Sequence, residues 1–72
     1  MSEEISLGEI RVRTRFNPSQ NGVVYEIKQK TAELINLINS QKYVSEEQER
    51  LKSIAITKYE EASMWAVKSA TF

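Results

Sequence analysis

The chain has 72 residues, ten of them basic and ten acidic, and contains no cysteine, histidine or aspartate. A chain this short buries only a marginal core, and without cysteine it has no disulfides, so we expect oligomerisation to support the fold. The missing residue types exclude thiolate and histidine zinc sites and the common nucleophile–histidine pairs, so we expect no metal, no cofactor and no enzyme activity. Glu60 and Glu61 remain as a carboxylate pair, but neighbours on a helix point about 100° apart and do not converge on one substrate.

Charge is distributed unevenly although the formal net charge is zero. Residues 1–9 carry only acidic charge, whereas residues 11–31 hold five basic residues against the single Glu26. A concentrated basic segment in a neutral chain suits a small anionic ligand better than a nucleic acid, because duplex-binding domains usually carry a broader basic footprint. No apolar run approaches the length of a membrane span and the N-terminus lacks a basic-then-apolar signal layout, so we expect a soluble, intracellular protein with no membrane partner.

Residues 1–22 predict an extended arm that ends in a turn. Apolar or β-branched residues alternate there with arginines, in the order Ile10, Arg11, Val12, Arg13, Thr14, Arg15 and Phe16. A period of two is typical of a strand. One interpretation is an edge strand that its arginines keep soluble, and the other places at least one arginine on a ligand phosphate. The segment 17–22, Asn-Pro-Ser-Gln-Asn-Gly, is rich in turn-forming residues and ends the arm.

Apolar residues at spacings of three and four predict a first helix over residues 23–40, with Asn21 as its N-cap. Lys28 and Thr31 share one face of this helix, whereas Lys30 lies about 160° around the axis from Lys28. A solvated lysine beside an ordinary β-branched contact is one interpretation. The other is an ammonium on a phosphate, with the Thr31 hydroxyl as a second donor.

Residues 45–70 predict a second helix, which begins at the capping box Ser45-Glu46-Glu47-Gln48. Its apolar residues crowd onto one side: Leu51, Ile54, Ala55, Ile56, Tyr59, Ala62, Trp65, Ala66, Val67 and Ala70. This arc is wider than the stripe of about 100° on a simple surface helix, and one partner helix cannot cover it. The predicted fold is therefore mainly α, a single domain over residues 1–72 in which the arm precedes an antiparallel two-helix hairpin that assembles as a homo-oligomer.

Aromatic residues offer surfaces on which a nucleobase could stack. Phe16 is the better candidate because it ends the arm beside a loop and next to Arg15, and Tyr25 is a second candidate. Trp65 lies at helical spacing among apolar residues, so we expect it to pack against other side chains.

Three segments carry a resemblance. They are residues 15–18 (Arg-Phe-Asn-Pro), residues 27–35 (Ile-Lys-Gln-Lys-Thr-Ala-Glu-Leu-Ile) and residues 56–66 (Ile-Thr-Lys-Tyr-Glu-Glu-Ala-Ser-Met-Trp-Ala). Together they resemble the hairpin domain shared by the bacteriophage anti-CBASS and anti-Thoeris nucleotide sponges, over about residues 13–70. The third segment is the most specific of the three.

The resemblance implies a compact homo-oligomer, typically a hexamer, in the cytoplasm of an infected bacterial host. Family members bind cyclic nucleotide immune messengers without cleaving them, in pockets between subunits. The family's basic residue and hydroxyl early in the first helix correspond to Lys28 or Lys30 and to Thr31. The residues that cover the base correspond to Asn17 and Pro18. The chain lacks the family's tyrosine near that point, where Phe16 or Tyr25 would substitute.

The resemblance predicts a sponge for cyclic GMP-AMP-like dinucleotides, with cyclic trinucleotides as further ligands, which blocks the activation of CBASS effectors. One alternative is a sponge for the cyclic ADP-ribose-type messengers of Thoeris. Another is a small structural or nucleic-acid-binding helical oligomer. The candidate ligand-binding residues are Arg15, Phe16, Asn17, Tyr25, Lys28, Lys30 and Thr31, with no catalytic or metal-binding residue.

Overall fold

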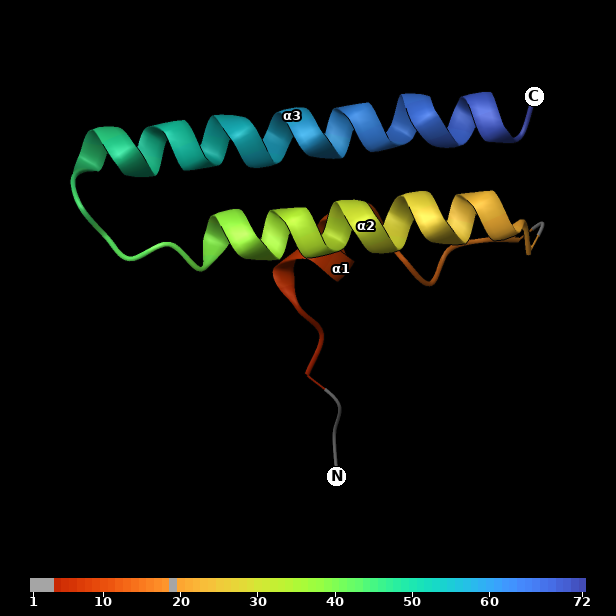
Figure 1. Cartoon of the computed structure of the whole chain (residues 1–72), viewed down its shortest axis with the longest axis horizontal. Helices are drawn as coiled ribbons and strands as arrows, with labels where there is room; N and C mark the ends of the chain where they lie inside the picture. The colour runs from red at the N-terminus through yellow and green to blue at the C-terminus, as the bar shows by residue number, and fades with distance from the viewer. Residues whose placement is uncertain (1–3, 19) are drawn as a thin grey trace.

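A computed structural model describes residues 4–18 and 20–72, and this part of the chain contains three helices and no strand. Helix α1 spans Leu7–Val12, α2 spans Gly22–Asn39 and α3 spans Glu46–Ala70. Helices α2 and α3 run antiparallel as a hairpin, and α1 lies against α2 (Figure 1). The Cα atoms span 41 × 34 × 12 Å, so the chain is thin along its shortest axis.

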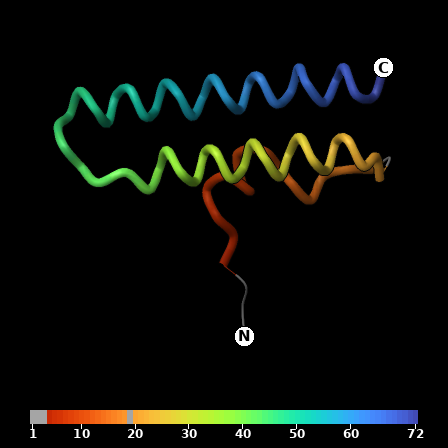
Figure 2. The backbone as a smooth tube through the Cα atoms, viewed as in Figure 1, coloured from red at the N-terminus to blue at the C-terminus, as the bar shows by residue number. Residues whose placement is uncertain are grey.

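The bounds of α2 and α3 lie within one residue of those predicted, because both helices begin at strong local caps. The Asn21 side chain accepts hydrogen bonds from the backbone N–H groups of Val23 and Val24, and Ser45 accepts from Gln48 N–H. Asn21 also donates from Nδ2 to the Ala70 carbonyl at 3.3 Å. This bond joins the start of α2 to the end of α3, and the backbone trace shows these two ends side by side (Figure 2).

The predicted extended arm is wrong over residues 7–12, because Leu7–Val12 is helical. Ser6 caps this helix, and the Glu9 side chain accepts in return from the Ser6 backbone N–H in a complete capping box. Arg13 ends the helix in the left-handed conformation, at φ 58°. Residues 1–3 and 19 of the predicted arm and turn lie outside the described residues.

Close approach of two backbones holds α1 against α2. A Cβ atom built on Gly8 would lie 2.1 Å from the Ala32 carbonyl oxygen, so only glycine fits there. The Gly8 N–H donates to Asn36 Oδ1 at 2.7 Å, and Asn36 Nδ2 donates to Ser6 Oγ at 3.0 Å. These contacts between residues far apart in sequence override the β-branched character of the segment.

The core of the single chain is small. Its buried apolar cluster comprises Val12, Ala32, Ile35 and Ile56, with Leu7 and Ile38 packed against it. In α3 the buried residues are Ile56 and Ser63, and much of the predicted apolar arc remains exposed. Ile54 is 43% exposed, and Trp65, which we expected to pack, is 63% exposed. One chain therefore leaves this arc uncovered, and assembly into an oligomer stays a prediction.

Candidate functional site

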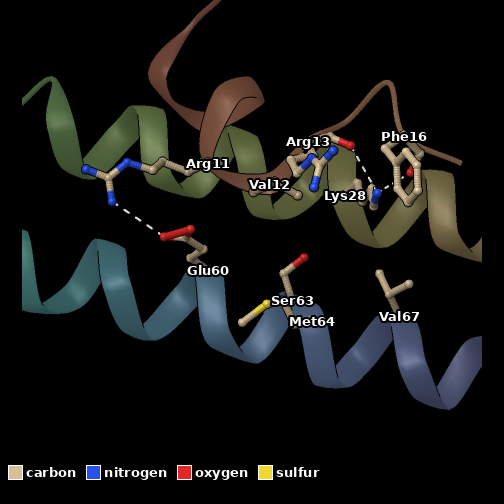
Figure 3. Close-up of a pocket in the computed structure, with 9 residues that line it drawn as sticks. All are labelled: Arg11, Val12, Arg13, Phe16, Lys28, Glu60, Ser63, Met64 and Val67. Carbon is tan, nitrogen blue, oxygen red and sulfur yellow. Dashed lines mark hydrogen bonds and ion pairs between the residues drawn. The ribbon is translucent and has the colours of Figure 1, made fainter.

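The segment after α1 lies where α1, the first half of α2 and the last third of α3 meet. On one side of it is a hollow of about 290 Å³, which we call the arginine hollow. It is lined by Arg11, Val12, Arg13, Phe16, Lys28, Glu60, Ser63, Met64 and Val67 (Figure 3). Three helices and the loop thus contribute to one depression that carries basic, aromatic and hydroxyl groups.

A second hollow of about 330 Å³ also borders Phe16, and we call it the proline hollow. Its lining residues are Phe16, Asn17, Pro18, Val24, Lys28, Val67 and Thr71. Phe16, Lys28 and Val67 line both hollows. The two hollows are therefore neighbouring parts of one surface, arranged around the Phe16 ring.

Lys28 is only 6% exposed, although it is charged. Its ammonium donates hydrogen bonds to the carbonyl oxygen of Arg13, at 3.0 Å, and to that of Phe16 (Figure 3). Burial, together with the nearby Arg13 guanidinium, lowers the pKa of Lys28 from its ordinary value. The bonds to two carbonyls satisfy the buried ammonium, which would otherwise be costly to bury.

The Phe16 ring lies among cations yet keeps an open surface. The Arg13 guanidinium carbon is 4.9 Å from the ring centroid and the Lys28 ammonium is 5.4 Å from it, both within cation–π range. Phe16 is nevertheless 57% exposed. The ring can therefore present apolar surface to a planar ligand group while positive charge stands beside it.

Arg11 lies at the rim of the arginine hollow, opposite α3. Its Nη1 atom is 3.4 Å from Glu60 Oε1, and both side chains are partly exposed. An exposed ion pair of this kind contributes little to stability, because solvent screens it. The Arg11 guanidinium can therefore turn toward an anion in the hollow at small cost.

Asn17 lines the proline hollow, but its amide group is engaged with the backbone. Its Nδ2 donates to the Asn21 carbonyl at 3.0 Å, and its Oδ1 accepts from the Asn21 N–H at 3.2 Å. Asn17 thus fastens the end of the loop to the start of α2. Arg15 is exposed and close enough to Glu9 to help lower the pKa of that carboxyl group.

Arg15 lines neither hollow, and the same holds for the other three candidate residues, Tyr25, Lys30 and Thr31. Tyr25 and Lys30 are exposed on α2, and Lys30 forms an ion pair with Glu26 at 3.3 Å. The Thr31 hydroxyl donates to the Ile27 carbonyl of its own helix at 2.7 Å. Within one chain, the structure brings together Phe16, Asn17 and Lys28 around the two hollows. It places the other four candidates outside them: Arg15, Tyr25, Lys30 and Thr31.

Arg11, Arg13 and Ser63 line the arginine hollow, although sequence reasoning assigned none of them individually to the site. The alternating pattern predicts that both arginines belong to a strand, and it gives no indication that they lie beside α3. Ser63 is seven residues after the buried Ile56, and this spacing puts both on one face of α3. That spacing is a signal that could have found Ser63.

In residues 4–18 and 20–72, no group of three or more acidic, histidine or cysteine side chains is placed to hold a metal ion. Among the same residues, no helix combines the length and apolar character that crossing a bilayer requires.

Comparison with known proteins gives one match. The family model described as Acb2/Tad1, hairpin domain, matches residues 7–71, which is most of the chain. Neither the curated proteins nor the solved structures include a significant match. The resemblance carried by the three sequence segments is confirmed, and the chain belongs to the Acb2/Tad1 hairpin-domain family.

Proposed function

We propose that this protein is a sponge that binds cyclic oligonucleotide second messengers without cleaving them and so blocks the activation of CBASS effectors. Its family membership implies a sponge-type role against antiphage defence. The messengers are cyclic GMP-AMP-like dinucleotides, with cyclic trinucleotides as further ligands. The protein acts in the cytoplasm of the infected bacterial host, where such messengers are made.

The observation that carries this proposal is the exposed Phe16 ring, which borders both hollows and has the Arg13 guanidinium beside it. A cyclic dinucleotide presents aromatic bases and phosphates close together. Aromatic rings stack with bases of any sequence, and guanidinium groups match phosphate oxygens in a two-pronged geometry. Phe16 would stack with a base, while Arg13 and Arg11 would neutralise a phosphate in the arginine hollow.

The size of the hollows supports a site that needs more than one subunit. Pockets for small molecules usually measure about 300–1,000 Å³, and each hollow is at or below the lower end of that range. A ligand of two nucleotides extends beyond either one. A second subunit, packed on the exposed arc of α3, would supply the missing wall. In such an assembly, Tyr25, Lys30, Thr31 or Arg15 of another subunit would reach the ligand.

Binding the messenger is enough to block the activation of the effector, so the proposal needs no catalytic step. The chain lacks histidine, cysteine and aspartate, the side chains that most often cleave phosphodiesters or assist in their cleavage. When binding sites outnumber messenger molecules and free sites exceed Kd, nearly all of the messenger is bound. The effector then receives too little messenger to be activated.

A second candidate ligand is the cyclic ADP-ribose type of messenger made in Thoeris defence. The family that matches the chain is named for both sponge types. Both ligand classes present adenine and phosphates, and the groups around Phe16 suit either one. Separate titrations with each ligand distinguish them.

The proposal is tested by native mass spectrometry of the purified protein with cyclic di- and trinucleotides and cyclic ADP-ribose isomers. We expect discrete adducts on a homo-oligomer, a hexamer, with the ligand released unchanged on heating. An oligomer that takes up none of the panel, but shifts DNA or RNA in a salt-sensitive way, would replace the sponge with a nucleic-acid-binding protein. Cleaved ligand would show an enzyme instead.

A further inference from the structure

Lys28 has hydrogen-bond partners within its own chain. Its ammonium carries three N–H donors, and two of them are directed at the carbonyl oxygens of Arg13 and Phe16. The side chain is almost fully buried, and the Phe16 ring lies beside the ammonium (Figure 3). To bind a phosphate strongly, this lysine would have to release one of the carbonyls or use its single remaining donor.

The two carbonyls bracket the turn that leaves α1, residues 13–16, which we call the 13–16 loop. Arg13 is the left-handed residue that ends α1, and the Phe16 N–H donates back to the Arg13 carbonyl at 2.9 Å. Lys28 lies 15 residues after Arg13 and 12 after Phe16, on another helix. One ammonium therefore ties both ends of the loop to α2.

The 13–16 loop carries the groups that surround the proposed ligand. Arg13 and Phe16 line the arginine hollow, and Phe16 also lines the proline hollow. Because Lys28 holds the backbone at both residues, the positions of the guanidinium and the ring depend on it. If the two Lys28 bonds were lost, the loop would keep its internal hydrogen bond from the Phe16 N–H to the Arg13 carbonyl. Lys28 would then no longer tie the loop to α2.

We propose that Lys28 is a positioning residue, which acts through the 13–16 loop and holds Arg13 and Phe16 ready for the ligand. It does not itself neutralise the phosphate. The inference rests on the proposed function for the identity of the ligand, whereas the tie between Lys28 and the loop belongs to the free protein. Holding the loop raises affinity because the apparent Kd equals the intrinsic Kd divided by the fraction of molecules in the competent arrangement.

The first arm of the test follows Phe16 in the ligand-free protein. 4-Fluorophenylalanine incorporation gives fluorine signals at Phe16 and Phe72, and the Phe72→Leu variant assigns them. Lys28→Met keeps the length and apolar stem of the side chain but removes the ammonium. We expect it to move or broaden the Phe16 signal in a protein that circular dichroism shows to be helical. The control Lys42→Met removes a lysine from the far end of the hairpin and leaves the signal unchanged.

The second arm measures the Kd for cyclic GMP-AMP by calorimetry, at a temperature where each variant is helical. If the loop is in the competent arrangement in nearly all wild-type molecules but in only about one in ten Lys28→Met molecules, the variant's Kd is about tenfold higher. Lys28→Arg restores a charged donor. We expect its affinity, and the position and width of its Phe16 signal, to lie between those of Lys28→Met and the wild type. A purely structural lysine would lower the melting temperature without changing either quantity in the folded variant.

Three results overturn the inference: an unchanged Phe16 signal in folded Lys28→Met, an unchanged Kd, or weaker binding with Phe16 in its wild-type position. The last of these would show direct contact between Lys28 and the ligand. If Lys28→Met does not fold, Lys28→Arg decides, because it keeps the charge but moves the donors. Weaker binding with a shifted Phe16 signal then supports positioning, and weaker binding with an unshifted signal overturns it.

A failure of the proposed function would give a different result from a failure of this inference. In that case the wild-type protein binds no cyclic nucleotide at all. The fluorine spectra of the free protein still decide whether Lys28 holds the 13–16 loop, since they require no ligand.

Discussion

Gly8 and Ala32 lie in such close contact that a Cβ atom on Gly8 would be 2.1 Å from the Ala32 carbonyl oxygen. Real Cβ atoms do not approach a backbone oxygen this closely, so any larger residue at position 8 must push α1 away from α2. Because α1 leads directly into the 13–16 loop, this contact also sets where Arg13 and Phe16 lie. Gly8 thus contributes, together with Lys28, to the geometry of the candidate site.

Gly8→Ala is therefore expected to destabilise the protein by about 1–3 kcal/mol, as overpacking usually does. The matched control is Gly22→Ala, where a Cβ atom would meet nothing within 4 Å. That variant should change stability by less than about 1 kcal/mol. Urea denaturation followed by circular dichroism measures both, and equal stabilities of the two variants would contradict the role of the contact.

Acid should weaken the attachment of α1. The Glu9 carboxylate accepts hydrogen bonds at 3.0 Å from the Ser6 backbone N–H and hydroxyl, and these bonds lower the pKa of Glu9 from its ordinary value. Because the folded-state pKa is the lower one, the stabilisation is fully present above about pH 4.5 and is lost as the pH falls through the folded-state value.

The measurement for this prediction is stability against pH for the wild type and for Glu9→Gln. The difference between the two removes the contribution of the other carboxyl groups, such as Glu47, which is paired with Arg50. We expect the wild type to lose its advantage over the variant below pH 4.5. Parallel curves from pH 7 to pH 2 would show that Glu9 does not stabilise α1.

Arg13→Gln should weaken the binding of cyclic GMP-AMP by about 10- to 100-fold, because a hydrogen bond to a charged group contributes about 1.5–3 kcal/mol. Glutamine keeps a long polar side chain and, like arginine, has no special preference for the left-handed backbone. Lys42→Gln, at the other end of the hairpin, removes the same charge from outside the site and serves as the control. Calorimetry measures both, and an unchanged Kd for Arg13→Gln would remove this arginine from the proposed site.

Substitutions on the exposed arc of α3 should break up the proposed oligomer. Ile54→Glu places a carboxylate where we expect a second subunit to pack, and burying an unpaired charge is strongly unfavourable. Arg50→Glu is the control, since Arg50 is exposed and its ion pair is with Glu47 of its own helix. Sedimentation velocity should give a smaller species for Ile54→Glu alone. Equal sedimentation of both variants and the wild type would place the interface elsewhere.

The hairpin could be predicted from the sequence because its signals are local. Asn21 and Ser45 are good N-caps, and the apolar residues of α2 repeat at helical spacing. Helix α1 could not be predicted in the same way. The alternation of Ile10, Val12 and Thr14 with arginines has the period of a strand, and the prediction that follows it misses the capping box of Ser6 and Glu9.

Part of the candidate site could also be predicted from the sequence. Phe16, Asn17 and Lys28 were selected from residue type and resemblance, and the structure places all three around the two hollows. The burial of Lys28 could not be predicted, because it depends on a loop whose position follows from α1. Arg11, Arg13 and Ser63 were missed because they meet only through the packing of α1 against α2 and α3.

The sequence by itself thus determined the two long helices, the surplus of apolar surface on α3, the absence of the usual catalytic residue types and the family. These properties depend on neighbours along the chain or on residue type, which a sequence states directly. Only the tertiary structure decided that residues 7–12 form a helix, that Lys28 lies inside and that Arg13 and Phe16 share a hollow. Each of these depends on contacts between residues distant in sequence, such as Gly8 with Ala32 across 24 residues and Lys28 with Arg13 across 15. Local preferences carry no information about such contacts.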